Sequence, residues 1–464
     1  NRFTVDGPVA EGARCREAEC ACLDALLDDA RHGGDVLRRG RLNVLAHVLE
    51  KPYAQILAEF KDPVDAHNWR IDLGWTGDVK YHAGARVRRR HDHPGDVTIA
   101  LAPNPSHLEA VNPVVEGMAR AAGTNASEPG SQRFDGHATL PLLIHGDTAF
   151  PGQGIVAETL NLSRLDGYHT DGTIHIIANN QLGFTATPGE SYSTSYASGL
   201  ARGFKIPIIH VNADDPAACL EAARMAWEYR ARFRKDFLID LIGYRRHGHN
   251  EGDEPAFTQP VMYKAITAHK TVRELFAESL VKHGMVSLGT PDALVKKHFG
   301  VLEQTFASLK PEEDYAPPIP APVPPGLAAK TQTGVPIELL RDLNESLLST
   351  PSGFNVHKKL ERVRDRKRNM LAGTNERTVD WGGAEELAFA SILAEGVPIR
   401  LTGEDVQRGT FSHRHAVLHD AVTGVEHVPL QQLPQARASF EIHNSPLTEA
   451  GTIGFEFGFN MQDP

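Results

Sequence analysis

Two short polar motifs carry the residue types that bind a divalent metal together with a diphosphate. Gly-Asp at 146–147 and Asn-Asn-Gln-Leu at 179–182 each follow an apolar run. Asp147 offers a carboxylate, Asn180 an amide oxygen and Leu182 a backbone carbonyl. Hard oxygen ligands of this kind suit Mg²⁺, which usually keeps waters and takes further ligands from a diphosphate. The alternative is that Asp147 caps a helix and Asn180 shapes a turn.

Alternating strands and helices are expected to bring the two motifs together. A helix is predicted at 152–165, and another starts with an Asp cap before Pro216 and reaches about Lys235. Continuous apolar strands are typical of a parallel sheet covered on both faces, where ligands bind at the carboxyl ends of strands. Both motifs should therefore meet at one edge. The apolar runs that predict strands are 140–145, 173–178, 207–212 and 237–244.

Composition is that of an ordinary globular protein. Of the 464 residues, 41% are hydrophobic and 23% charged, enough to bury a sizeable core. The net charge of −11 argues against a general nucleic-acid binder. No apolar run is long enough to predict a membrane span, and no targeting segment is visible, so a cytoplasmic location is expected. Cys15, Cys20 and Cys22 lack the spacing of metal ligands and indicate reduced thiols.

Several longer stretches extend the pattern: 40–45 (GRLNVL), 77–82 (GDVKYH), 104–110 (NPSHLEA), 145–147 with 152–154, 179–184, 244–251 (YRRHGHNE) and 409–415 (GTFSHRH). Together they resemble the 2-oxoglutarate dehydrogenase family, in its first, decarboxylating component. The resemblance covers about residues 39–460, and motifs of this length are highly specific. A generic NAD-binding dehydrogenase is not expected, because no strand runs into a G-x-G-x-x-G turn that opens a helix.

The resemblance implies a thiamine-diphosphate-binding α/β fold, in which a parallel sheet has helices on both faces. A linker and the start of a second α/β domain follow. Helices are also expected at 339–348, 356–371 and 385–393, and a strand at 399–401. The predicted parts are an unmatched segment at 1–38, a diphosphate-binding domain at 39–315, a Pro-rich linker with helices at 316–375, and a truncated pyrimidine-binding domain at 376–464.

The activity implied by the resemblance is oxidative decarboxylation of 2-oxoglutarate in the tricarboxylic acid cycle. The succinyl group passes to a lipoyl-bearing succinyltransferase subunit of the same complex. Thiamine diphosphate and Mg²⁺ are the implied cofactors, and a homodimer is the implied assembly. Two alternatives stay open: the same chemistry on 2-oxoadipate, and a truncated, non-catalytic chain that only binds cofactor or a partner.

Roles at the cofactor also follow from the resemblance. Asp147, Asn180 and the carbonyl of Leu182 would hold Mg²⁺ on the diphosphate. Glu456 resembles the glutamate that hydrogen-bonds the aminopyrimidine ring of a cofactor held by the other subunit. The alternative for Glu456 is a solvated helix residue. The remaining residues expected to line the cofactor are Arg39, Ser106, Leu108, Thr148 and Ala149.

Histidines are the expected contacts of the 2-oxo acid. The resemblance places His82 on the substrate, with Ser106 nearby, and a structural histidine is the alternative. The loop at 245–255 would border the entrance to the active site. This makes His247 and His249 candidates for substrate or lipoyl contacts, with His249 also a catalytic candidate, unless the loop is merely polar. His413 and His415 match the family without a defined role.

The sequence departs from the family pattern at a substrate-binding position. Family members carry a histidine where this chain has Arg38. Arginine can still pair with a carboxylate, but it cannot both donate and accept a proton near neutral pH. Substrate preference is therefore in question. His91-Asp92-His93 has metal-like spacing, but it lies in an Arg-rich stretch that matches the family poorly and is interpreted as surface.

Overall fold

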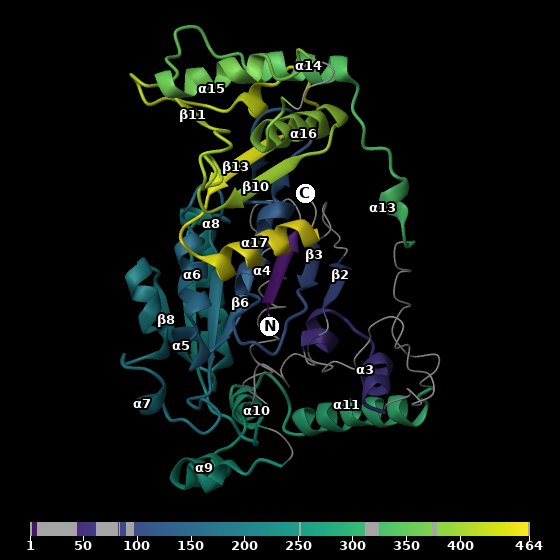
Figure 1. Ribbon diagram of the computed structural model, residues 1–464. Coiled ribbons are helices and arrows are strands. Elements are labelled where there is room, and N and C mark those ends of the chain that lie inside the picture. The colour runs from purple at the N-terminus through teal and green to yellow at the C-terminus, as the bar shows by residue number, and fades with distance from the viewer. Residues whose placement is uncertain are drawn as a thin grey trace. The chain divides into compact units, whose positions relative to one another are not determined.

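A computed structural model describes residues 2–6, 44–61, 82, 84–89, 97–249, 252–310, 324–373 and 378–462. The chain divides into two compact units (Figure 1). Unit 1 takes residues 1–122, 136–318 and 457–463, and unit 2 takes residues 123–135, 319–456 and 464. Arg38, Arg39, the 91–93 motif, Cys15, Cys20, Cys22 and most of the Pro-rich stretch lie outside the described residues, and so does most of the segment 1–38.

Unit 1 is built on a seven-stranded sheet with the order β2-β3-β1-β6-β7-β9-β8. The last four strands in that order run parallel to one another. Each coincides with a predicted strand, so the parallel sheet expected from the apolar runs is confirmed. These four strands are β6 (Thr139–Gly146), β7 (Ile174–Asn179), β8 (Ile208–Asn212) and β9 (Phe237–Ile242).

Three antiparallel strands that no apolar run in the sequence predicted extend the sheet beyond β6. They are β1 (Arg2–Asp6), β2 (Ala85–Arg89) and β3 (Val97–Leu101). In β2 the exposed side chains of Arg86 and Arg88 alternate with half-buried neighbours, which is the two-residue period of a strand. Charged side chains on an edge strand also discourage pairing with another chain.

Helices cover both faces of the sheet, as expected. On one face α8 (Pro216–Phe233) packs on β8 and β9. On the other, α4 (Asn112–Ala122) packs on β6, while α6 (Gly154–Leu162) and the 3-10 helix η5 (Ala197–Phe204) share a buried cluster with β7 and β9. The predicted start of α8 is confirmed, because the Asp215 side chain accepts a hydrogen bond from the Ala218 amide at 3.0 Å.

The predicted helix at 152–165 is wrong at both ends. The chain instead forms a short helix α5 (Ala149–Gly152), and α6 begins at Gly154 and ends at Leu162. Gln153 between them is extended, with φ −92° and ψ 117°. The other helical elements of unit 1 are η1 (Val44–Val48), α3 (Tyr53–Lys61), α7 (Pro188–Ser191), η6 (Pro255–Phe257), α9 (Pro260–Ala268), α10 (Val272–Lys282) and α11 (Thr290–Ala307).

Unit 2 is organised around two parallel strands, β10 (Ile399–Gly403) and β13 (Phe440–Asn444). Helices α14 (Ile337–Leu347) and α16 (Trp381–Glu395) share a buried apolar cluster with them. With α15 (Lys358–Arg368), these elements confirm the helices and the strand predicted there. The remaining elements are β4 (Thr124–Asn125), β5 (Arg133–Phe134), α13 (Leu327–Lys330), β11 (Leu418–His419), β12 (Glu426–His427), η7 (Pro429–Gln432) and α17 (Glu449–Gln462), whose residues up to Glu456 belong to unit 2.

In the part of the chain that the structure describes, no helix combines the length and apolar character needed to cross a bilayer.

The core of unit 1 holds a carboxyl group on the buried face of α4. Glu116 is buried and accepts hydrogen bonds from the hydroxyls of Thr170 at 3.0 Å and Thr173 at 2.8 Å. Burial, together with repulsion from Asp236, raises the pKa of Glu116 to about 7, although His175 and the two hydroxyls oppose the shift. The folded state therefore holds this proton more tightly than the unfolded chain does.

We expect Glu116→Gln to flatten the dependence of stability on pH. Because the folded pKa lies above the unfolded one, the wild-type chain loses stability as pH rises from about 4.5 to about 7. Between pH 5 and pH 8 the wild type should lose about 2–3 kcal/mol more than the variant, measured by urea unfolding. Glu128→Gln, at an exposed position, is the control and should follow the wild type. Equal losses for Glu116→Gln and wild type would contradict the interpretation.

Candidate cofactor and metal site

Asp147 and Asn180 lie together at the carboxyl edge of the parallel sheet. Gly146 of β6 pairs with Ala178 of β7, so the residues that follow the two strands emerge side by side. The Asp147 side chain accepts hydrogen bonds from the backbone amides of Asn180 and Thr148. The structure thus brings the two predicted motifs to one place.

The Asp147 carboxylate is held in an environment that disfavours its charge. Asp147 is 3% exposed, and this burial raises the pKa of its carboxyl group to about 7. Repulsion from the Asp240 carboxylate raises this pKa by a smaller amount. Among the described residues, Oδ2 of Asp147 is buried without a hydrogen-bond partner. A buried acceptor oxygen left in this state fits a cation that is bound when the site is filled.

Side-chain hydrogen bonds hold the turn after β7. The Asn179 side chain accepts from the Gln181 amide at 3.1 Å, and Gln181 donates its own side-chain amide to the Gly243 carbonyl at 2.8 Å. Gln181 lies in the left-handed region with φ +62°. The Asn180 Oδ1 accepts from the Leu182 amide at 3.0 Å. Asn180 therefore does shape a turn, as the alternative held, and one lone pair of its oxygen stays available for a metal.

Asp147 does not cap the helix that follows it, which was the alternative role for this residue. The N-cap residue of α5 is Thr148, and no side chain caps that helix. The hydroxyl of Thr148 instead donates to the Ser191 hydroxyl at 3.2 Å. A Cβ at Gly183 would meet the Thr148 side chain at 2.5 Å, so the turn after β7 packs closely against the Thr148-Ala149 segment.

Asp240 supports the turn after β7, and no motif in the sequence predicted this residue. Asp240 is fully buried in β9 and accepts from Asn179 at 3.0 Å and from the Ser198 hydroxyl at 3.1 Å. It also lies 3.0 Å from Nδ1 of His210. The available signal was a lone charged residue inside the apolar run at 237–242. Partners of this kind fix the orientation of ligand side chains.

The predicted substrate residues His82 and Ser106 lie together, with 3.3 Å between His82 Nε2 and Ser106 Oγ. Leu108 in the same loop is 44% exposed. The next residue, Glu109, has φ +66° and turns its carboxylate into the core. There it meets His145 Nδ1 at 2.7 Å. This contact ties the loop that carries Ser106 to the strand that leads into Asp147.

His145 itself belongs to a buried polar row that no local motif predicted. Its Nε2 lies 3.0 Å from Nδ1 of His175, and His175 Nε2 lies 3.7 Å from Asp236. Each of these side chains is buried. The row crosses the face of the sheet under α4 and gives that face a defined polar pattern.

The loop after β9 approaches the turn after β7 through His249. The ring of His249 meets the Phe184 ring edge-on at 4.8 Å, and its backbone amide donates to Asp253 at 2.7 Å. His247 lines a neighbouring cavity of about 950 Å³ together with Lys264. The structure therefore places His249 beside the residues that follow Asn180.

Glu456 is engaged within unit 2. The Arg400 side chain donates to both of its carboxylate oxygens, and the Thr402 hydroxyl donates to Oε1 at 2.7 Å. His415 Nε2 lies 2.9 Å from the Ser412 hydroxyl, and burial lowers the pKa of His415. The side chain of His413 lies against Gly409, where an added Cβ would clash with its ring.

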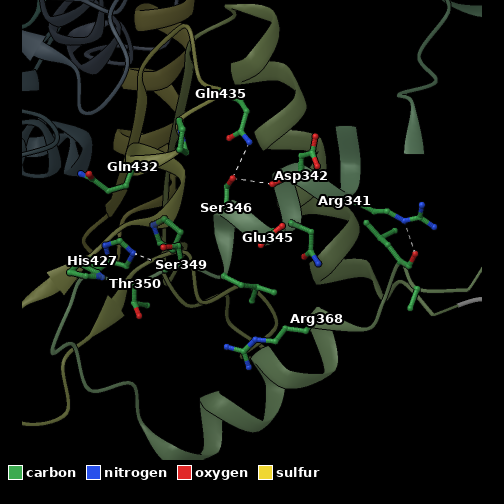
Figure 2. A pocket seen from close by; sticks show the side chains of 17 residues that line it. Arg341, Asp342, Glu345, Ser346, Ser349, Thr350, Arg368, His427, Gln432 and Gln435 are labelled. Atoms are coloured by element: carbon green, nitrogen blue, oxygen red, sulfur yellow. Dashed lines mark hydrogen bonds between the residues drawn. The ribbon is translucent and has the colours of Figure 1, made fainter. Parts of the chain in front are cut away.

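A second cavity, of about 1170 Å³, lies in unit 2 between α14, α15 and the segment around His427 (Figure 2). Its arginines, Arg341 and Arg368, each pair with a carboxylate of their own helix, Glu338 and Asp365. As far as the structure describes its walls, they include none of the predicted site residues. Size alone therefore does not identify the candidate site.

The described residues contain no group of three or more His, Cys, Asp or Glu side chains arranged to hold a metal. A cation at Asp147 would thus depend on the Asn180 oxygen, a carbonyl and ligands from outside the chain. This is the donor set expected for Mg²⁺ on a diphosphate.

Two families of known proteins match this chain. The dehydrogenase E1 component family matches residues 40–314, and the transketolase pyrimidine-binding domain matches residues 377–464. The 2-oxoglutarate dehydrogenase E1 component of Geobacillus kaustophilus is 52% identical and covers 100% of this chain. The proteins of the same name from Bacillus mycoides and Bacillus cereus strain B4264 are each 51% identical, over 95% and 100% of this chain.

The chain spans about half the length of these curated relatives, with 49%, 47% and 48% of each covered in the order given. The family match nevertheless extends over more than half of the chain and includes Asp147, Asn180 and the loop at 104–110. The α/β architecture with its parallel sheet fits both matched domains. The chain therefore belongs to the dehydrogenase E1 component family.

Proposed function

We propose that this chain serves the oxidative decarboxylation of 2-oxoglutarate, with transfer of the succinyl group to a lipoyl-bearing succinyltransferase subunit. The relatives compared are named 2-oxoglutarate dehydrogenase E1 component, which favours this substrate over 2-oxoadipate and favours an enzyme over a non-catalytic chain. The observation that carries the proposal is the buried, unpartnered Oδ2 of Asp147 beside Asn180. A cytoplasmic location stays a prediction.

In this proposal Asp147, Asn180 and the Leu182 carbonyl hold Mg²⁺. Thiamine diphosphate, when bound, supplies a nucleophilic carbon and an electron sink for the loss of CO₂. Asp147 offers Oδ2 to the cation, and the turn fixed by Asn179 and Asp240 presents the other two oxygens. Residues proposed to line the cofactor are Arg39, Ser106, Leu108, Thr148 and Ala149, of which Arg39 lies outside the described residues.

His82 and Ser106 are proposed to bind the 2-oxo acid. Their side chains share a hydrogen bond at 3.3 Å, so they present polar atoms at one point of the loop. Arg38, also proposed for the substrate, lies outside the described residues. His249 and His247 are proposed to border the entrance, where a lipoyl group would approach, and this is supported by the contact of His249 with Phe184. Glu456 is proposed to hydrogen-bond the aminopyrimidine ring.

Thiamine diphosphate should bind only with Mg²⁺, and Asp147→Ala should weaken that binding by at least about a hundredfold, because it removes the single charged ligand. Titration calorimetry with and without Mg²⁺ measures this. The loaded wild type should release CO₂ from 2-oxoglutarate faster than from 2-oxoadipate, and Asp147→Ala should release almost none. Asp166→Ala, at an exposed position, is the control. Wild-type affinity in Asp147→Ala, or binding that ignores Mg²⁺, would overturn the proposal.

A homodimer is part of the proposal and is supported by an apolar stripe on α17. Ile453, Phe457 and Met461 follow one another at intervals of four residues and are 69%, 58% and 42% exposed. Residues at this spacing share one helix face, and large apolar side chains gathered there indicate a protein partner.

Phe457→Glu should shift the chain toward the monomer, because it places a charge in the apolar stripe. Sedimentation velocity over a concentration series measures the shift. Val422→Glu adds the same charge at another exposed position, 78% exposed, and should leave the dimer intact. A chain that is monomeric before substitution, or a dimer unchanged by Phe457→Glu, would rule out this interface.

A further inference from the structure

Arg400 is a buried guanidinium on the small sheet of unit 2. Its side chain is 4% exposed, and it stands opposite Glu441 in the parallel pairing of β10 with β13. Thr402, two residues along β10, projects on the same side of the strand. Both side chains reach Glu456 on α17. Residues of a strand and a helix, separated by more than fifty positions in the chain, therefore meet at one carboxylate.

The contacts fix the plane of the Glu456 carboxylate. Arg400 Nε donates to Oε2 at 3.0 Å and to Oε1 at 3.2 Å, and Nη2 donates to Oε1 at 3.1 Å. The Thr402 hydroxyl adds a bond to Oε1 at 2.7 Å. Paired bonds from a guanidinium set both the direction and the plane of a carboxylate, which a lysine ammonium does not do.

The guanidinium is itself held in place on its other side. Glu441 Oε2 lies 3.0 Å from Arg400 Nη1, and His443 Nε2 lies 2.7 Å from Glu441 Oε1. The Phe455 ring lies 5.5 Å from the guanidinium carbon. Buried charges in such an array usually add little net stability compared with apolar residues. Fold stability alone is therefore a weak explanation of the array.

The two oxygens of Glu456 are used unequally. Oε1 accepts bonds from Thr402 and from two nitrogens of Arg400, whereas Oε2 accepts one, from Nε. The Glu456 side chain is 27% exposed, so it is accessible to a ligand. An ionised carboxylate has no hydrogen to donate and can only accept hydrogen bonds. A further partner at Oε2 must therefore bring a hydrogen.

We propose that Arg400 and Thr402 are positioning residues that hold Glu456 Oε2 ready to accept a hydrogen bond from a protonated ring nitrogen of an aminopyrimidine. The inference rests on the proposed function, since it concerns the same cofactor. It adds that β10, through Arg400 and Thr402, determines the geometry of this contact. The competing explanation is that the bonds from Arg400 and Thr402 to Glu456 only attach α17 to β10.

The test compares two ligands by titration calorimetry in the presence of Mg²⁺. The first is thiamine diphosphate, and the second is its 1′-deaza analogue, in which a CH group replaces the ring nitrogen that Glu456 would contact. The wild type should prefer thiamine diphosphate by about tenfold or more, the value of one charge-assisted hydrogen bond. Arg400→Lys and Thr402→Val should lose most of this preference and keep the affinity for the analogue.

Arg414→Lys is the matched control. Arg414 makes a similar pair of hydrogen bonds to Glu385 in the same unit, away from Glu456. Its Nε donates to Oε2 at 3.0 Å and its Nη2 to Oε1 at 2.6 Å. It should keep the wild-type preference even if it melts at a lower temperature. Thr402→Val removes a single hydroxyl and leaves the buried array intact, so it tests the inference even where Arg400→Lys folds poorly.

The outcomes separate the inference from the function on which it rests. A preference that survives in both Arg400→Lys and Thr402→Val overturns the inference and leaves the proposed function standing. A preference that survives in Glu456→Ala has the same effect, because the discrimination between the two ligands then does not depend on a contact between the ring nitrogen and the side chain at this position. Failure of the wild type to bind either ligand with Mg²⁺ overturns the proposed function and the inference with it.

Discussion

The parallel pairing of β6 with β7 is the constraint on which the candidate site depends. Gly146 opposite Ala178 places Asp147 against the backbone amide of Asn180. A slip of one residue would turn every side chain of the strand to the other face and separate the two. The apolar side chains that hold this register thus also determine where the oxygens point. The fold tolerates a buried carboxylate without a full set of partners, and the cation that we propose at this position would compensate for it.

Around this edge the polar residues form a supporting layer. Asp240 holds the turn after β7 through Asn179, and Glu109 holds the loop of Ser106 through His145. In both cases a buried carboxylate fixes a backbone segment that includes a residue in the left-handed region. Ligand groups carried on segments held in this way lose little freedom when a ligand binds. The two segments should therefore behave as parts of one rigid edge.

The parallel sheet and the two motifs could be predicted from the sequence because both signals are local. Apolar runs mark buried strands, and Asp147 and Asn180 directly follow two of them. The supporting contacts are not local: His145 and Glu109 are 36 positions apart, and Arg400 and Glu456 are 56 apart. No spacing rule connects such pairs. Strand β1 has only five residues, and the break at Gln153 interrupts an otherwise helical pattern, so neither was predicted.

The most direct test of the account is the position of the metal itself. Crystals of the chain grown with thiamine diphosphate and Mn²⁺, which occupies oxygen-rich sites of the same kind, would locate the ion by anomalous diffraction. The account predicts one peak within coordination distance of Asp147 Oδ2, the Asn180 side-chain oxygen and the Leu182 carbonyl. A peak elsewhere, or bound cofactor with no metal at Asp147, would contradict it.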